Sequence, residues 1–206
     1  MARPKEEIRA DMQKRLGALS KAVFSQKGTE AAARLWTRDE WKTYASVLLF
    51  LSTEYEISTQ SLLELAFIDR KQVFAPRIDG AQLCFYRVPS PRGPWTEGTP
   101  GIREPPREVP LAMEHFPALV VTPGLAFDRH GRRLGRGKGF YDRFLAGLDA
   151  GVLSGAPAAG GPAENRPGYF VCGMCLEIQL VDEVPAESRD RPVNGILTEK
   201  RFLLCG

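Results

Sequence analysis

Glycines and arginines are concentrated near the middle of the chain, where residues 120–144 read VVTPGLAFDRHGRRLGRGKGFYDRF. Four glycines let the backbone turn sharply and approach a ligand closely: Gly131, Gly135, Gly137 and Gly139. Four cations accompany them: Arg132, Arg133, Arg136 and Lys138. A helix that begins directly after such a loop adds free N–H groups and the positive end of its dipole. The segment therefore predicts a phosphate site, with Asp142 placed to hold Mg²⁺ against the phosphate.

The spacing excludes two common phosphate loops. A Walker A loop needs glycine where Arg132 stands and Ser or Thr where Gly139 follows Lys138. The dinucleotide motif G-x-G-x-x-G fails at Phe140. Besides phosphate binding, a solvated basic turn and a nucleic-acid patch remain open, and Asp128 and Asp142 flanking the loop weaken the latter.

Alternating strands and helices must position this loop. Solid apolar runs predict buried strands at residues 45–51, 118–122 and 169–174, with shorter strands at 73–75, 83–88 and 194–198, the last of the chain. Helices are predicted at 58–69, about 30–36 and about 138–148, and an apolar face from Ile8 to Val23 predicts one more. Lys5 and Arg9 lie on one side of that first helix. The order predicts a three-layer α/β/α fold with a mostly parallel sheet, as a single domain over residues 1–206.

Composition narrows the class of protein. The chain has 206 residues, 43% hydrophobic and 26% charged, which is typical of a globular protein rather than a disordered one. The net charge of +3 is too small to argue for nucleic acid by itself. Residues 1–15 resemble no secretory signal and no apolar run is long enough to cross a bilayer, so we expect a cytoplasmic protein. Cys172 and Cys175 have C-x-x-C spacing but no second pair of ligands nearby, so we interpret them as buried hydrophobes rather than zinc ligands.

Several motifs resemble those of the 5-formyltetrahydrofolate cyclo-ligase family, also called 5,10-methenyltetrahydrofolate synthetases. PGLAFDRHGRRLGRGKGFYD is similar to the family signature P-G-x-x-F-D-x-x-G-x-R-L-G-x-G-x-G-[YF]-Y-D. Further blocks follow in the family's order: the N-terminal K-x-x-x-R, LSTEYEISTQSL, GIREP and QLVDEVPAESRDRPVNGILTE. They extend from Lys5 to Glu199, so the resemblance covers most of the chain.

The resemblance implies a fold of the NagB/RpiA/CoA-transferase-like type and an ATP- and Mg-dependent ligase. Its substrates would be ATP and 5-formyltetrahydrofolate, and its products 5,10-methenyltetrahydrofolate, ADP and phosphate. ATP would phosphorylate the formyl oxygen, and the neighbouring nitrogen would then close the ring. No nucleic-acid or membrane partner is implied, and we expect a monomer or weak dimer.

The resemblance also implies roles for individual residues. The catalytic residues would be Arg136, Lys138 and Tyr141. ATP would be bound by Lys5, Arg9, Arg133, Leu134, Gly135, Arg136, Gly137, Lys138, Gly139, Phe140 and Tyr141. Leu51, Glu56 and Tyr141 would contact the folate, and Asp142 and Asp190 would hold Mg²⁺. By composition alone, Lys5 and Arg9 are typical of a solvated helix face and Glu56 of an exposed loop acid.

Two departures from the family pattern affect these roles. Pro100 stands where many members carry an aromatic side chain that stacks on the folate, and Trp95 is a substitute close in sequence. Asn194 replaces a frequent acid, which leaves Asp190 as the downstream carboxylate. Two alternatives stay open: an ATP-binding paralogue that acts on a different small molecule, and a basic nucleic-acid-binding module.

Overall fold

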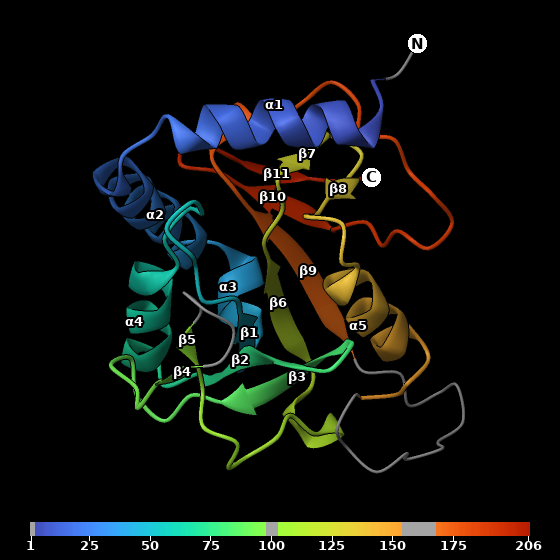
Figure 1. Cartoon of the computed structure of the whole chain (residues 1–206). Helices are drawn as coiled ribbons and strands as arrows, with labels where there is room; N and C mark the ends of the chain where they lie inside the picture. Colours follow the sequence, from blue (N-terminus) through green and yellow to red (C-terminus); the bar gives the residue numbers. More distant parts are fainter. Residues whose placement is uncertain (1–2, 98–102, 154–167) are drawn as a thin grey trace.

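A mixed seven-stranded sheet forms the centre of the fold (Figure 1). The computed structural model describes residues 3–97, 103–153 and 168–206. Within them the strand order is β11-β10-β9-β6-β1-β2-β3. The strands are β1 (Ser46–Leu49), β2 (Gln72–Asp79), β3 (Gln82–Arg87), β6 (Ala118–Thr122), β9 (Tyr169–Met174), β10 (Gly195–Leu197) and β11 (Phe202–Leu204). The inner pairs from β2 to β10 are parallel, and β3 and β11 add antiparallel edges.

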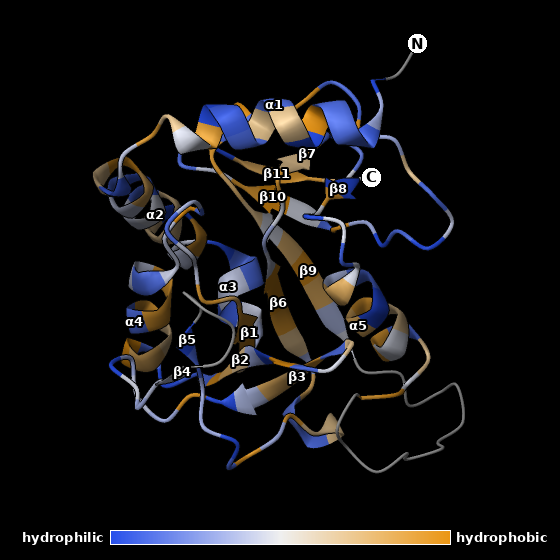
Figure 2. Ribbon diagram, viewed as in Figure 1, coloured by the Kyte–Doolittle hydropathy of each residue, from blue (hydrophilic) through white to orange (hydrophobic). Residues whose placement is uncertain are grey.

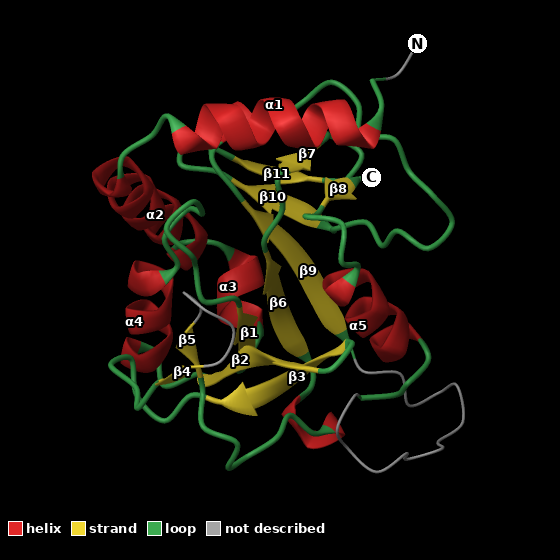
Figure 3. Ribbon diagram, viewed as in Figure 1, coloured by secondary structure: helices red, strands yellow, loops and turns green. Residues whose placement is uncertain are grey.

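Helices cover both faces of this sheet (Figure 3). One face carries α1 (Lys5–Gly17), α2 (Lys21–Trp36), α3 (Asp39–Thr43) and α4 (Gln60–Ile68), and the other carries α5 (Phe140–Asp149). Alternation along β1 explains the two cores: Val47 and Leu49 pack with α1, α2 and α4, whereas Leu48 packs with Phe144 of α5. Figure 2 shows the hydrophobic colour continuing along the central strands. The predicted three-layer α/β/α fold is confirmed.

The predicted parallel β-α-β unit is also confirmed. The chain passes from β1 through α4 to β2, and Val47 is in register with Val73. β6 and β9 cover the residues expected from the sequence, and β6 pairs with β1 in parallel. Buried on both faces, these strands contain near-continuous apolar residues, which made them recognisable.

Two boundaries differ from the sequence prediction. The apolar face from Ile8 to Val23 belongs to two helices, because α1 ends at Gly17 and Ser20 is extended (φ −81°, ψ 157°) before α2 begins at Lys21. α2 consequently starts nine residues earlier than the predicted Glu30. The strand predicted at 194–198 is not the last one, because β11 returns antiparallel to β10 after a turn in which Thr198 Oγ1 accepts from the N–H of Arg201.

Smaller elements complete the described chain. Two short hairpins stand apart from the main sheet, β4 (Thr96–Glu97) with β5 (Arg103–Glu104) and β7 (Ala126–Phe127) with β8 (Arg133–Leu134). Single 3₁₀ turns lie at Met113–His115 and Glu177–Gln179. Cys172 and Cys175 are buried in the cores on opposite faces of the sheet, as expected for packing residues. No helix in the described part of the chain is long and apolar enough to cross a membrane.

Candidate functional site

A cavity of about 540 Å³ opens beyond the carboxyl ends of β1 and β6. Phe50 and Leu51 follow β1 into its wall, and Pro123 and Gly124 follow β6. The chain leaves β1 toward α4 on one face of the sheet and leaves β6 toward α5 on the other. Parallel α/β sheets bind ligands at this kind of switch point, because the diverging connections leave a crevice there.

The glycine–arginine loop forms one side of the cavity. It passes through the β7–β8 hairpin and reaches α5 at Gly139, whose φ of +64° suits a residue without a side chain. Gly131 is also required, since a Cβ there would lie 2.3 Å from the carbonyl oxygen of Val193. The first N–H groups of α5 and its positive end thereby border the cavity.

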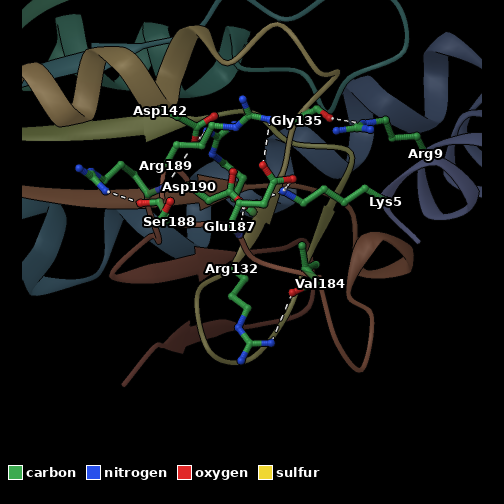
Figure 4. A network of polar contacts seen from close by, with 12 residues as sticks. Lys5, Arg9, Arg132, Gly135, Asp142, Val184, Glu187, Ser188, Arg189 and Asp190 are labelled. Atoms are coloured by element: carbon green, nitrogen blue, oxygen red, sulfur yellow. Dashed lines mark hydrogen bonds and ion pairs between the residues drawn. The ribbon is translucent and has the colours of Figure 1, made fainter. Parts of the chain in front are cut away.

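Helix α1 supplies two cations to the same cavity (Figure 4). Lys5 Nζ donates to Glu187 Oε1 at 2.9 Å and to Asp190 Oδ2 at 2.7 Å. Arg9 Nε donates to the carbonyl oxygen of Gly135 at 3.1 Å. These contacts fasten the start of the chain to the loop before α5 and to the loop 187–191.

The ion pairs of Lys5 shift the pKa values of Lys5 and of its partner Asp190. Burial acts to raise the pKa of Asp190, but the hydrogen bond from Lys5 and its charge outweigh burial and lower it. Burial likewise acts to lower the pKa of Lys5, and the two carboxylates outweigh it and raise that pKa. Both groups are therefore held in their charged forms.

Asp142 lies where three segments meet. Its Oδ1 accepts from Arg133 Nη2 at 2.7 Å and from the backbone N–H of Arg191 at 3.2 Å. The Arg133 side chain is only 4% exposed, and its Nε has no hydrogen-bond partner among the described residues. A buried guanidinium needs a carboxylate, so Asp142 is required here for charge compensation in addition to any ligand.

Glu56 and Arg136 approach each other across the cavity, with Arg136 Nη2 3.7 Å from Glu56 Oε1. The other oxygen of Glu56 accepts from the backbone N–H and the hydroxyl of Thr53, at 2.9 and 3.0 Å. This local turn explains why a loop acid is held facing inward. Arg136 and Lys138 are exposed within the cavity wall and free to reach a ligand.

Tyr141 lines the same cavity as Glu56 and Arg136 and lies in the first turn of α5. The guanidinium of Arg133 lies 5.6 Å from its ring centre. Burial, reinforced by the nearby Glu56 charge, raises the pKa of its hydroxyl far above the usual value. The hydroxyl therefore stays protonated at neutral pH and can donate a hydrogen bond, but it is a poor base.

The structure brings together every residue to which the family resemblance assigns a role, whereas Arg132 of the predicted phosphate cluster does not line the cavity and pairs with Glu183 instead. All fifteen line the one cavity: Lys5, Arg9, Leu51, Glu56, Arg133, Leu134, Gly135, Arg136, Gly137, Lys138, Gly139, Phe140, Tyr141, Asp142 and Asp190. They come from segments up to 185 residues apart. Of the two folate-stacking positions considered, Pro100 lies outside the described residues and Trp95 packs against the core with Arg103 over its ring.

Sequence reasoning missed other residues of this wall. Glu187 and Arg191 stand in a charged run that is typical of a solvated loop, yet they contact Lys5 and Asp142. Glu104 of the wall forms an ion pair of 3.0 Å with Arg77, with side chains 3% and 12% exposed, and this pair ties β5 to β2 behind the cavity lining. The separation along the chain left no local signal for these pairs.

No cluster of three or more His, Cys, Asp or Glu able to hold a metal occurs in the residues that the structure describes. Mg²⁺ bound to nucleotides uses one or two carboxylates together with phosphate and water. Asp142 Oδ2 and Asp190 Oδ1 accept no hydrogen bond from the residues that the structure describes, and both side chains line the cavity, which fits such shared coordination.

A crevice at the carboxyl ends of parallel strands, a glycine–arginine loop and a helix start are together typical of α/β enzymes that bind phosphate. Comparison with known proteins identifies the family. Residues 2–199 match the model of the 5-formyltetrahydrofolate cyclo-ligase family, and the chain therefore belongs to that family.

Individual relatives agree over the full length. The chain is 28% identical to the probable 5-formyltetrahydrofolate cyclo-ligase of Schizosaccharomyces pombe, over 98% of both chains. It is 28% identical to the Escherichia coli K12 5-formyltetrahydrofolate cyclo-ligase, over 92% of this chain and 97% of that one. The solved structure of Aquifex aeolicus 5,10-methenyltetrahydrofolate synthetase matches with a TM-score of 0.76 and 26% identity, over 97% of this chain and 92% of that one.

The protein is thus an enzyme with 5-formyltetrahydrofolate cyclo-ligase activity, in a family of ATP-dependent ligases of one-carbon metabolism. The family assignment favours the cyclo-ligase hypothesis over the two alternatives, a paralogue with a different small-molecule substrate and a nucleic-acid-binding module.

Proposed function

We propose that this chain closes the folate ring in one cavity, using ATP and Mg²⁺ and the residues that the sequence singled out. The observation that carries the proposal is their convergence: fifteen residues from separate parts of the chain line one space of about 540 Å³. Pockets of this size bury a drug-sized ligand.

ATP binds at the glycine–arginine loop in this proposal. Lys5 and Arg9 face the phosphates from α1, and residues 133–141 wrap them from the other side. Arg136 and Lys138 lie closest to the transferring phosphoryl group, where cations that neutralise developing charge are most effective. The start of α5 supplies N–H groups for the same anion.

The carboxylates of Asp142 and Asp190 would hold Mg²⁺ beside the bound ATP. When bound, it neutralises phosphate charge during the transfer. Arg133 and the N–H of Arg191 hold Asp142 in place, and Lys5 does the same for Asp190. These contacts orient both side chains, and the contact with Lys5 lowers the pKa of Asp190.

Folate binds toward Leu51, Glu56 and Tyr141. A pterin presents several N–H donors, and the carboxylate of Glu56 is a ready acceptor that Thr53 already orients. The protonated Tyr141 hydroxyl donates to the formyl oxygen. Arg136 then bridges the two halves of the cavity, because it faces Glu56 while belonging to the ATP loop.

The chemistry follows from the poor reactivity of an amide. The formyl oxygen attacks the γ-phosphorus of ATP and ADP leaves. The neighbouring aniline nitrogen then attacks the activated carbon and loses its proton, and phosphate departs with the former formyl oxygen. Since phosphoryl transfer demands positioning and charge neutralisation, the cations and N–H groups of this cavity are the required parts.

A turnover assay tests this proposal. Wild-type protein is mixed with Mg-ATP and 5-formyltetrahydrofolate, and the near-ultraviolet absorbance of methenyltetrahydrofolate is followed. Arg136→Ala and Glu56→Gln are run beside it, with Arg129→Ala as an exposed control outside the cavity. ATP-dependent product that collapses in the two cavity variants supports the proposal. Undiminished turnover in both variants contradicts the residue roles.

The cytoplasmic location, the single domain over residues 1–206 and the monomeric or weakly dimeric state stay predictions. Size-exclusion chromatography with light scattering measures the last of these.

A further inference from the structure

Arg143 joins two walls of the cavity through their backbones. Its Nη1 donates to the carbonyl oxygen of Lys138 at 2.9 Å, in the glycine–arginine loop. Its Nε and Nη2 both donate to the carbonyl oxygen of Ala81, at 3.2 and 2.7 Å. Ala81 lies in the turn between β2 and β3, 62 residues away.

The hairpin that Arg143 contacts is itself part of the cavity. Pro76, Ile78 and Leu83 of β2 and β3 line the same cavity as the loop. Arg143, which itself lines the cavity, therefore connects Lys138, the residue predicted to meet the transferring phosphate, to the β2–β3 hairpin. In the described part of the chain no carboxylate lies within ion-pair distance of it, so its donors are committed to these carbonyls.

The surroundings fix the guanidinium in this role. A Cβ on Gly139 would lie 3.0 Å from Arg143 Nη1, so the missing side chain makes room for the guanidinium. The ring of Phe140 lies on its other side, with a centroid distance of 5.3 Å. The planar fork of arginine reaches two carbonyls at once, whereas the single ammonium of lysine does not.

We propose that Arg143 is a positioning residue that holds Lys138 and Gly139 in their ligand-binding conformation by bracing the loop against the β2–β3 hairpin. This inference rests on the proposed function, because it assigns the loop to ATP. It adds a mechanical link, since ordering the loop with nucleotide also orders the hairpin tip on the other wall. Arg143 is not required to touch the substrate.

The test combines nucleotide binding with amide hydrogen exchange in Arg143→Met, which keeps an unbranched stem of similar length. Arg143→Lys is the conservative variant. Arg15→Met is the matched control, because Arg15 is an exposed arginine on a helix outside the cavity. Mg-ADP is the probe, and its dissociation constant is measured by calorimetry.

We expect Arg143→Met to weaken Mg-ADP binding by about tenfold, the effect of losing charged hydrogen bonds, with Arg143→Lys between it and the wild type. In wild-type protein, Mg-ADP should slow exchange at residues 135–139 and also at 80–83. In Arg143→Met it should slow exchange only at 135–139. Without ligand, the same variant should exchange faster at both segments.

Unchanged nucleotide affinity, or equal protection of residues 80–83 in Arg143→Met, overturns the inference. A loss of thermal stability without these changes shows a structural role alone. If wild-type protein neither binds Mg-ADP nor forms product, the proposed function fails. The ligand-free exchange rates then still decide whether Arg143 braces the two segments.

Discussion

Arg136 and Glu56 form an ion pair across the cavity, 3.7 Å between Nη2 and Oε1, although one belongs to the predicted ATP loop and the other to the predicted folate wall. Their side chains are 46% and 18% exposed, so the pair contributes at most about 1 kcal/mol. Such a weak contact opens readily, and each ligand can separate the pair at little cost.

Glu56→Gln should affect the binding of the two substrates differently. We expect the KM for 5-formyltetrahydrofolate to rise about tenfold or more, since a charged acceptor is lost. The KM for ATP should change by about fivefold at most, because only the weak pair with Arg136 disappears. Steady-state kinetics with each substrate varied in turn measure both values.

Glu54→Gln is the matched control, because Glu54 lies on the same loop but is half exposed and pairs with Lys21. Equal increases of both KM values in Glu56→Gln would contradict the assignment of Glu56 to the folate wall.

Lys138→Met removes a cation that is exposed at the cavity and has no ion pair with any residue described by the structure. We expect kcat to fall about 10²- to 10³-fold, as for loss of one group that stabilises transition-state charge. The urea unfolding midpoint should remain close to the wild-type value, since no internal contact of this side chain is broken. A wild-type kcat would remove Lys138 from the reaction.

Asp142→Asn and Asp190→Asn should lower the free energy of unfolding by different amounts but change the Mg²⁺ dependence of the activity in the same direction. Both should raise the Mg²⁺ concentration that gives half-maximal rate. Only Asp142→Asn leaves the 4%-exposed Arg133 without a charge partner, which should cost about 3 kcal/mol in the free energy of unfolding. Urea unfolding and Mg²⁺ titrations of activity check the two effects, and an unchanged Mg²⁺ dependence in both variants would argue against the metal assignment.

The contact between Lys5 and Asp190 predicts a pH dependence. The folded pKa of Asp190 is lowered, so its stabilising effect is present above its unfolded pKa of about 4 and is lost as the pH falls through the folded value. The folded pKa of Lys5 is raised, so its share is present below about pH 10 and lost above it. The difference in unfolding free energy between wild type and Lys5→Met should therefore be constant from about pH 5 to about pH 9, between the two unfolded pKa values. It should shrink as the pH falls below about 4. A difference that is the same at pH 7 and at about pH 2 would contradict this.

The cysteines should behave as packing residues. Burial raises the pKa of both the Cys172 and the Cys175 thiols. Neither should react with iodoacetamide at pH 8 in the native protein, whereas both should react after unfolding in urea. Mass spectrometry of the alkylated peptides counts them, and native labelling of either thiol would contradict the predicted burial.

Much of the fold could be predicted from the sequence because its local patterns were strong. β6 and β9 are apolar runs, β6 ends at Pro123 and Gly124, and the loop between β8 and α5 carries a motif of specific spacing. The break between α1 and α2 escaped prediction because Leu19 and Val23 continue the apolar spacing past Gly17. Gly17, which ends α1, and Ser20, the N-cap of α2, are the local stop and start signals that this continuing apolar spacing obscured.

Some residues of the candidate site could likewise be predicted from the sequence, and others could not. Residues within motifs, such as Arg136 and Lys138, were identified from spacing. Glu187 and Arg191 were not, because their partners lie far away in sequence and charged runs are ordinarily solvated. Arg143 carried a weaker signal: it stands four residues after Gly139, on the same side of the coming helix.

The fastening of α1 to the loop 187–191 has a consequence for how the enzyme is made. The partner of Lys5, Asp190, is translated 185 residues after it. The strands that precede Asp190 can pair before that, but the wall that Lys5 and Asp190 share cannot close until Asp190 has been synthesised. Contacts of such long sequence separation bear the largest loop-closure entropy. This wall of the site is therefore completed after most of the sheet that carries it has been synthesised.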